Sequence, residues 1–246
     1  MRSNLRTARA GFTIIEILVV TAIIAIIAAM AIPKLQSARV AADESAAIGT
    51  LRSIYAAQIQ IQASRLIDTN GDGMPEYGYL GEMTGGIPAR VTGAGNVPVA
   101  GAVGVDELDP SVLVSGLGAV QQSVVTRSGY IFQVFLPSAT VAGAVGAIAE
   151  DVTGGKAAAP FPDPINGSLY WCAYAWPTQR GKTGVHAFFV NQDGQVMKTR
   201  GTVAAYEALT APPAFDAAYT APGDLSSPAA SNGVVAVDGN QWDLVP

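Results

Sequence analysis

Cysteine and histidine are almost absent from this chain of 246 residues, which holds one of each, Cys172 and His186. A single cysteine excludes an intrachain disulfide, and the pair is too small for a Cys/His zinc site or a multi-histidine metal centre. A basic excess is also missing, because 14 Lys and Arg stand against 19 Asp and Glu, a net charge of −5. Without the cationic surface that neutralises phosphates, no nucleic acid is expected as a partner.

Catalytic motifs are missing as well. Cys172 and His186 are candidates for a nucleophile and a base, but their aromatic and apolar neighbours predict a buried thiol and a partly buried histidine. Gly181-Lys182-Thr183 matches the end of a phosphate-binding loop, yet Trp176 stands where that loop needs its first glycine. There is no Gly-x-Ser-x-Gly, and the acids are scattered. We therefore expect no catalytic residues and no enzyme activity.

A long apolar run is present near the N-terminus. After Arg2, Arg6 and Arg9, residues 12–32 contain Glu16 as their only charge. As a helix, these residues would extend about 31 Å at roughly 1.5 Å per residue, enough to span a bilayer. The arginines would keep the N-terminus cytoplasmic. The proline that follows, Pro33, predicts a kink or a short melted stretch in this helix.

A cleavable secretory signal is the alternative interpretation, because Ala29-Met30-Ala31 fits the small-x-small cleavage pattern. Such signals usually have a shorter apolar core, and they rarely contain a carboxylate near its start. Glu16 at mid-bilayer would cost roughly 2.5–3.5 kcal/mol, and less near one end of the span. A tolerated cost of this kind indicates a partner for the carboxylate, which a discarded signal does not need.

The residues Gly11-Phe12-Thr13-Ile14-Ile15-Glu16, after a short basic leader and before the apolar run, resemble the processing site of type IV pilins and type II secretion pseudopilins. The resemblance implies that a membrane prepilin peptidase cuts after Gly11 and methylates the new amine of Phe12. It also implies that Glu16 pairs with the Phe12 amine of a neighbouring subunit during assembly, and that Pro33 is the family's helix-breaking proline. A cation from an adjacent chain would remove much of the cost of a carboxylate in hydrocarbon.

Beyond Pro33, a helical pattern continues from Lys34 to about Ser64, with an apolar stripe that strengthens after Ile48. Alternating and aromatic runs then predict strands at residues 129–136, 168–176, 185–190 and 195–198, the last two joined by a turn at 191–194. The remaining segments are expected to be a short helix near 109–125, a loop insertion at 137–164, a surface tail at 207–231 and a last strand at 234–237.

This layout predicts an α+β fold, in which a long N-terminal helix, membrane-spanning in its first half, packs on a small antiparallel β-sheet. Pilins have the same layout. The predicted segments are a leader peptide at 1–11, a transmembrane or filament-core helix at 12–33, an amphipathic helix at 34–64, and a globular domain with loop insertions at 65–246.

One loop has the spacing of a cation site. Asp68, Asn70 and Asp72 occupy alternate positions, Gly73 stands where an EF-hand loop turns, and Glu76 is at the ninth position. The twelfth position, however, is a tyrosine and not the bidentate glutamate of an EF-hand. A helix-ending turn rich in Asn, Asp and Gly would look similar, so calcium binding and a plain turn both stay open.

Together these features predict a structural subunit of a type IV pilus or a type II secretion pseudopilus. The precursor would be a single-pass inner-membrane protein with a cytoplasmic N-terminus, and the mature chain would lie in a periplasmic or extracellular filament. The implied partners are copies of itself, other pilins or pseudopilins, prepilin peptidase, an inner-membrane assembly platform and, before assembly, membrane lipid. The alternative is an exported or membrane-anchored monomeric binding protein or enzyme that uses residues 2–31 only for export.

Overall fold

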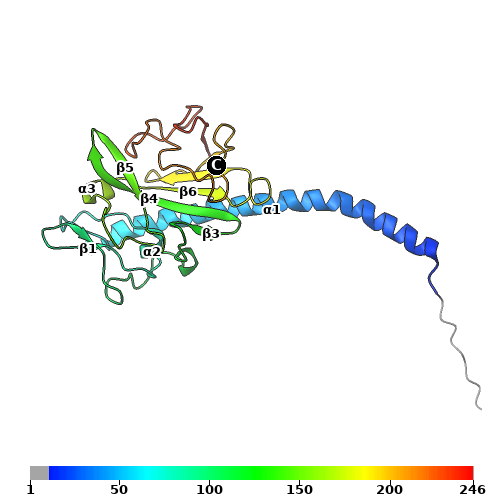
Figure 1. The fold of residues 1–246 in the computed structure, drawn as a ribbon, viewed down its shortest axis with the longest axis horizontal. Coiled ribbons are helices and arrows are strands. Elements are labelled where there is room, and N and C mark those ends of the chain that lie inside the picture. Colours follow the sequence, from blue (N-terminus) through cyan, green and yellow to red (C-terminus); the bar gives the residue numbers. More distant parts are fainter. Residues whose placement is uncertain (1–10, 246) are drawn as a thin grey trace, which may run out of the picture. The chain divides into compact units, whose positions relative to one another are not determined.

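A computed structural model describes residues 11–245, which fall into two compact units, one up to Arg39 and one from Val40 onward (Figure 1). A single helix, α1 (Ile14–Ser64), belongs to both units. The other elements, all in the second unit, are α2 (Leu80–Met83), β1 (Val91–Thr92), β2 (Pro98–Val99), the 3-10 helix η1 (Ser115–Leu117), β3 (Val125–Arg127), β4 (Tyr130–Val141), β5 (Ala144–Ala149), α3 (Pro164–Gly167), β6 (Cys172–Pro177), β7 (Ala187–Asn191), β8 (Met197–Thr199) and β9 (Asp243–Leu244).

Helix α1 remains helical through Pro33, so the melted stretch considered for this proline is not formed. Helix α1 ends at Ser64, where the sequence predicts its boundary. There the next residue, Arg65, takes a left-handed backbone conformation with φ of 51°, and the Leu66 amide donates to the carbonyl of Ile61 at 3.2 Å. A left-handed residue at this position turns the chain so that the next amide can donate to a carbonyl that the last helical turn leaves without a partner.

The second unit is built on a seven-stranded antiparallel sheet in the order β3-β4-β6-β7-β8-β9, with β5 paired to β4 (Figure 1). Strands β4, β6 and β7 form its centre, with Phe132 opposite Ala175 and Ala173 opposite Val190. The turn at residues 191–194 joins β7 to β8 as expected, and the Gly194 amide donates to the carbonyl of Asn191 at 3.0 Å. The predicted strands that carry aromatic residues are therefore present, but the one expected at 168–176 begins only at Cys172, because residues 168–171 form the turn after α3.

One face of the sheet is covered by the second half of α1. The buried side of this helix segment carries Leu51, Ile54 and Ile61, each without exposed surface, and it shares a core with the inward face of the sheet. Burying a large aliphatic side chain is worth roughly 1.5–3 kcal/mol, so this contact is a main source of stability for the unit. The α+β arrangement of a long helix on an antiparallel sheet is thus present.

The other face of the sheet is covered by the C-terminal part of the chain, which corrects the prediction of a surface tail at 207–231. Tyr219 and Leu225 from that segment are fully buried, and Trp242 joins them against Tyr174 and Phe189 of the sheet. The Tyr174 hydroxyl donates to the carbonyl of Phe215 and accepts from the Ala218 amide. The segment is therefore a second layer of the core and not a tail.

Three smaller predictions are also wrong. The helix expected near 109–125 is reduced to the single turn of η1. The loop insertion expected at 137–164 begins with the end of β4 and all of β5, which form a hairpin. The last strand is β9 and not 234–237, where only one isolated bridge links Val235 with Gln241.

Candidate processing and assembly site

The residues around the predicted cleavage position lie at the start of α1. Gly11 to Thr13 are not helical, and the helix begins at Ile14. The Thr13 hydroxyl accepts a hydrogen bond from the Glu16 amide at 3.2 Å, which is the contact of an N-cap residue. Of the predicted leader peptide, only Gly11 falls within the described residues; Arg2, Arg6 and Arg9 lie outside them.

This start of the helix suits the chemistry assigned to each residue. Phe12 is 78% exposed, and no atom lies within 4 Å of where a side chain would begin at Gly11, so the junction between them is open. Glu16 is exposed in the first helical turn, where a carboxylate is favoured by the positive end of the helix dipole. The peptide that would be cut therefore lies outside the helix, which starts at Ile14.

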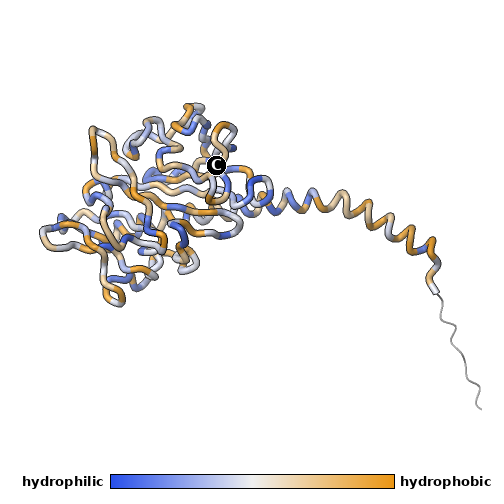
Figure 2. Tube along the Cα trace, in the orientation of Figure 1, coloured by the Kyte–Doolittle hydropathy of each residue, from blue (hydrophilic) through white to orange (hydrophobic). Residues whose placement is uncertain are grey.

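The apolar run that follows has no covering within the part of the chain that the structure describes. Figure 2 shows it as a long hydrophobic stretch of α1. Ile14, Leu18, Ile23 and Met30 are all about half exposed or more, and none of the most apolar 18-residue window is buried. By length and composition this is the one helix among the described residues that is able to cross a membrane. Pro33, the other predicted assembly residue, is exposed at its end.

A contact that the sequence did not reveal fixes α1 to the sheet. The carboxylate of Glu44 accepts hydrogen bonds from the amides of Val185 and His186 at 2.8 and 3.1 Å. Its second oxygen lies 3.0 Å from Nδ1 of His186, and both side chains are about four-fifths buried. Glu44 therefore holds the helix in register where β7 begins, and His186 is part of this polar contact.

The same geometry separates the two residues considered as a nucleophile and its base. Cys172 is opposite Asn191, at the far end of β7 from His186. The thiol is fully buried, and burial raises the pKa of Cys172 well above its usual value. The expectation of a buried thiol and a partly buried histidine is thus confirmed.

The candidate cation loop is closed by its own hydrogen bonds. Asp68 accepts from the amides of Gly71 and Gly73, and Asp72 accepts from the Met74 amide. The Asn70 side chain donates to Asp72 at 2.7 Å. Asp68 and Asp72 therefore bind backbone amides of their own loop, in the manner of Asx turns. Calcium binding at this loop stays a prediction.

Glu76, the fourth residue proposed for this loop, belongs to a different set of contacts. Its carboxylate accepts from the amide and hydroxyl of Thr69 and lies 3.3 Å from the guanidinium of Arg90. Arg90 is also 2.9 Å from Glu82, and all three charged side chains are essentially without exposed surface. Burial raises the pKa of Glu76, while Arg90 and Thr69 act against that rise. Among residues 11–245, no group of three or more Asp, Glu, His or Cys side chains is arranged to hold a metal.

Beside this cluster lies a carboxyl group without a cation. Glu150 accepts from the amides of Gly81 and Gly155 at 3.3 and 3.2 Å, and its other oxygen is buried with no hydrogen-bond partner. Burial raises the pKa of Glu150 to about 8. This residue is therefore largely protonated at neutral pH, whereas a carboxyl group in water is ionised at this pH.

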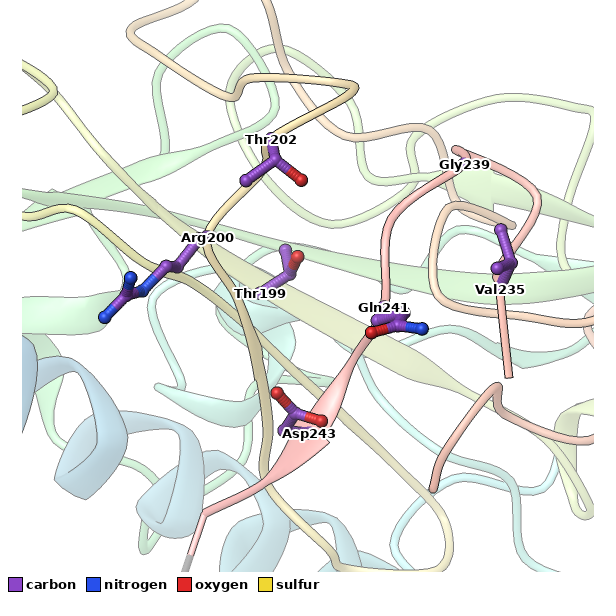
Figure 3. A pocket seen from close by; sticks show the side chains of 7 residues that line it. All are labelled: Thr199, Arg200, Thr202, Val235, Gly239, Gln241 and Asp243. Atoms are coloured by element: carbon purple, nitrogen blue, oxygen red, sulfur yellow. The ribbon is translucent and has the colours of Figure 1, made fainter. Parts of the chain in front are cut away.

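The surface of the second unit also has a shallow depression of about 330 Å³ at the β8–β9 edge of the sheet (Figure 3). Its side chains come from β8 and the following residues and from the segment leading into β9. Apart from Val235 and Gly239 they are polar or charged: Thr199, Arg200, Thr202, Gln241 and Asp243. None of the predicted site residues lines it, and its lining contains a single carboxylate, so it has no acid–base pair.

Comparisons with known proteins bear on the N-terminus. The profile of the prokaryotic N-terminal methylation motif matches residues 6–32, which include Gly11, Phe12 and Glu16. Neither a curated protein nor a solved structure matches the chain. The match covers the junction, the helix start and the exposed apolar run described above. This chain therefore carries the N-terminal methylation motif, the signal of type IV pilins and pseudopilins.

Proposed function

We propose that this protein is a structural subunit of a type IV pilus or a type II secretion pseudopilus, with no catalysis of its own. The observation that carries the proposal is the N-terminal methylation motif joined to an apolar helix that no other part of residues 11–245 covers. In this account prepilin peptidase cuts after Gly11 and methylates the amine of Phe12. The processed chain then passes from the inner membrane into a filament.

The exposed apolar side chains supply the driving force for both stages. Each large aliphatic residue gains roughly 1.5–3 kcal/mol when it leaves water. In the precursor this gain comes from lipid, with the helix as a single membrane span and the N-terminus in the cytoplasm. In the filament it comes from the same helices of neighbouring copies, packed in a common core. The sequential use of two apolar environments explains why the run has no polar face.

Glu16 is the residue that makes the second stage specific. A carboxylate near one end of a bilayer span carries a desolvation cost, which a neighbouring cation removes. After cleavage the new amine of Phe12 would be such a cation. It lies only four residues before Glu16 in the sequence, so each copy would carry both members of the pair at the same end of its helix. Pairing between copies would fix the axial step from one subunit to the next. The partners are therefore other copies or related pilins, received through an inner-membrane assembly platform.

The first experiment is mass spectrometry of the N-terminal peptide of the native protein. N-methylated Phe12 is the expected result. A chain that begins at Ile32, or one that keeps Met1, would instead support an exported or membrane-anchored monomer.

A second experiment asks whether Glu16 acts in assembly. We expect Glu16→Ala to leave the precursor in the membrane but to remove it from filaments, while the control Thr21→Val, in the same exposed helix, assembles normally. Normal assembly of the Glu16→Ala chain would contradict the role proposed for this carboxylate.

A further inference from the structure

A short loop after β5 packs closely against the region of α2 through two glycines. Residues 151–157 follow Glu150, the first residue after the strand, and we call them the flap. Gly154 and Gly155 have left-handed backbones, with φ of 96° and 62°. A Cβ atom at Gly155 would lie 2.5 Å from the side chain of Ile87, so glycine permits this close approach. The flap and Ile87 also line an apolar depression of about 220 Å³.

The hydrogen bonds that shape the flap are made inside it. The amide of Asp151 donates to the carbonyl of Gly155 at 2.8 Å, and the amide of Gly154 donates back to the carbonyl of Asp151 at 2.9 Å. The ammonium group of Lys156 lies 2.6 Å from the carboxylate of Asp151, which also accepts from the amide of Ala157. Because these bonds are internal, they do not have to break when the flap moves as one piece.

One carboxyl group joins the flap to α2. Oε2 of Glu150 accepts from the amide of Gly155 in the flap at 3.2 Å and from the amide of Gly81 in α2 at 3.3 Å. Its other oxygen is buried and has no hydrogen-bond partner among the described residues. The side chain is 2% exposed, so water does not reach it while the flap is closed.

The buried arginine of this core is already engaged with two other carboxylates. Nε of Arg90 lies 2.9 Å from Glu82, and Nη1 lies 3.3 Å from Glu76. Two carboxylates against one guanidinium leave an excess of one negative charge. An ionised Glu150 would add a further charge to this core, and a buried charge without a partner costs more than a buried neutral carboxyl group.

The charged and titratable groups around Glu150 also favour its neutral form. On the side of α2 these groups are Glu82 and Tyr79, and in the flap they are Asp151 and its partner Lys156. Burial, together with the charges of Glu82 and Asp151, raises the pKa of Glu150 to about 8, while the two amide hydrogen bonds act against this rise. At neutral pH the carboxyl group therefore keeps its proton in the closed flap and would lose it in water.

We propose that the flap is a proton-dependent closure, which stays packed on α2 while Glu150 holds its proton and opens when that proton passes to water, with the sheet still folded. In the open flap the carboxylate is hydrated, and the side of Ile87 that faces the flap is uncovered. The inference goes beyond the proposed function, because it concerns the response of the globular unit to pH and does not depend on assembly.

The ratio of open to closed molecules should rise with pH over a defined range. The carboxyl group has its ordinary pKa of 4.5 when the flap is open and a pKa of about 8 when it is closed. Between these values only the open form releases the proton, so the ratio rises about tenfold for each pH unit. The expected increase from pH 6 to pH 8 is about 50-fold, and the ratio levels off above pH 8.

The test is limited trypsin digestion of the full-length chain in detergent micelles between pH 6 and pH 9. Lys156 is in the flap, and Lys182 is an exposed residue in a surface turn. The rate of cutting at Lys156 divided by the rate at Lys182 is independent of the pH dependence of trypsin itself. When opening is fast, cutting reports the fraction of open molecules. We expect this quotient to rise about 50-fold from pH 6 to pH 8 and then to level off.

Two variants separate the proton on Glu150 from other effects. Glu150→Gln cannot ionise, so its quotient should stay constant with pH. The control Asp151→Asn loses the ion pair with Lys156 and should be cut about two- to fivefold faster at every pH, with the same rise as the unchanged chain. Partial burial would raise the pKa of Asp151, but hydrogen bonds from Lys156 and Ala157 lower it overall, so this acid does not titrate above pH 6.

Three outcomes would overturn the proposal. A constant quotient in the unchanged chain means that no proton-dependent opening occurs, and this result needs no variant that folds. An unaltered rise in Glu150→Gln means that another group controls the flap. A rise accompanied by new cuts at Arg90, which is fully buried, means that the whole unit unfolds. The proposed function would survive each of these results, because processing at Gly11 and assembly are measured separately.

Discussion

The two halves of α1 have similar helical backbones and opposite surroundings. In the first half large apolar residues point in every direction and stay exposed; in the second half they are confined to one side, which is buried against the sheet. Ile24 is 60% exposed, whereas Ile54 has no exposed surface. Hydrophobicity alone therefore does not place a residue in the core of its own chain. The distribution of apolar side chains around the helix determines whether they pack against the same chain or stay exposed to another molecule.

The largest effect should come from making the same substitution in both halves. Ile54→Ala removes a buried side chain from the core and is expected to lower the free energy of unfolding by about 2–5 kcal/mol. Ile24→Ala changes an exposed position and should leave the melting temperature of the full chain in detergent micelles within about a degree. Equal effects of the two substitutions would contradict the division of the helix described above.

A pH titration of unfolding tests the buried polar part of the second unit. The pKa of Glu150 is about 8 in the folded chain, above its ordinary value of 4.5. The unfolded chain therefore loses this proton first, and the associated stability, complete below pH 4.5, is lost as the pH rises toward 8. We expect Glu150→Gln to remove roughly 5 kcal/mol of this pH dependence. Asp243→Asn, a control at an exposed position, should keep the profile of the unchanged chain.

The contact between α1 and the start of β7 gives a smaller effect. Glu44→Gln keeps the shape of the side chain but weakens the contact with His186, so a loss of about 1 kcal/mol of unfolding free energy is expected. A double-mutant cycle with His186→Gln should show a coupling of similar size. Additive losses would mean that the two residues stabilise the unit separately.

The smallest effect should come from the first turn of α1. Thr13→Ala removes the hydroxyl that accepts from the Glu16 amide and should cost about 1 kcal/mol of local helix stability. Faster hydrogen exchange at residues 14–17 in micelles would report the loss, with no change in the melting temperature of the second unit. Thr13→Ser is the control and should exchange like the unchanged chain.

Strong local patterns predicted the fold well and weak ones did not. The apolar run is recognised by its length, the stripe that ends with Ile61 by its helical period, and the central strands by their aromatic residues, and all three are found where expected. Strand β5 is built from Ala, Val, Gly and Ile with little alternation, so its sequence resembles a loop. Tyr219 and Trp242 are buried through turns and isolated bridges, which leave no period in the sequence.

The residues of the candidate site also fall into those that a local pattern predicts and those that it does not. Gly11, Phe12 and Glu16 are contiguous enough to be recognised as a motif, and the profile match agrees with them. Glu44 and His186 are 142 residues apart, so their contact exists only after the chain has folded. Spacing alone groups Glu76 with Asp68, Asn70 and Asp72, whereas in the folded chain its carboxylate is buried 3.3 Å from Arg90, a contact that spacing does not predict.

The C-terminal layer is synthesised after the strands that it covers. Trp242 closes the second core and β9 adds an edge strand, and both follow β4, β6 and β7 in the chain. During synthesis, Phe189 and Tyr174 therefore lack the cover that Trp242 gives them on that face. A chain truncated before Trp242 would leave one face of its sheet with an exposed apolar flank.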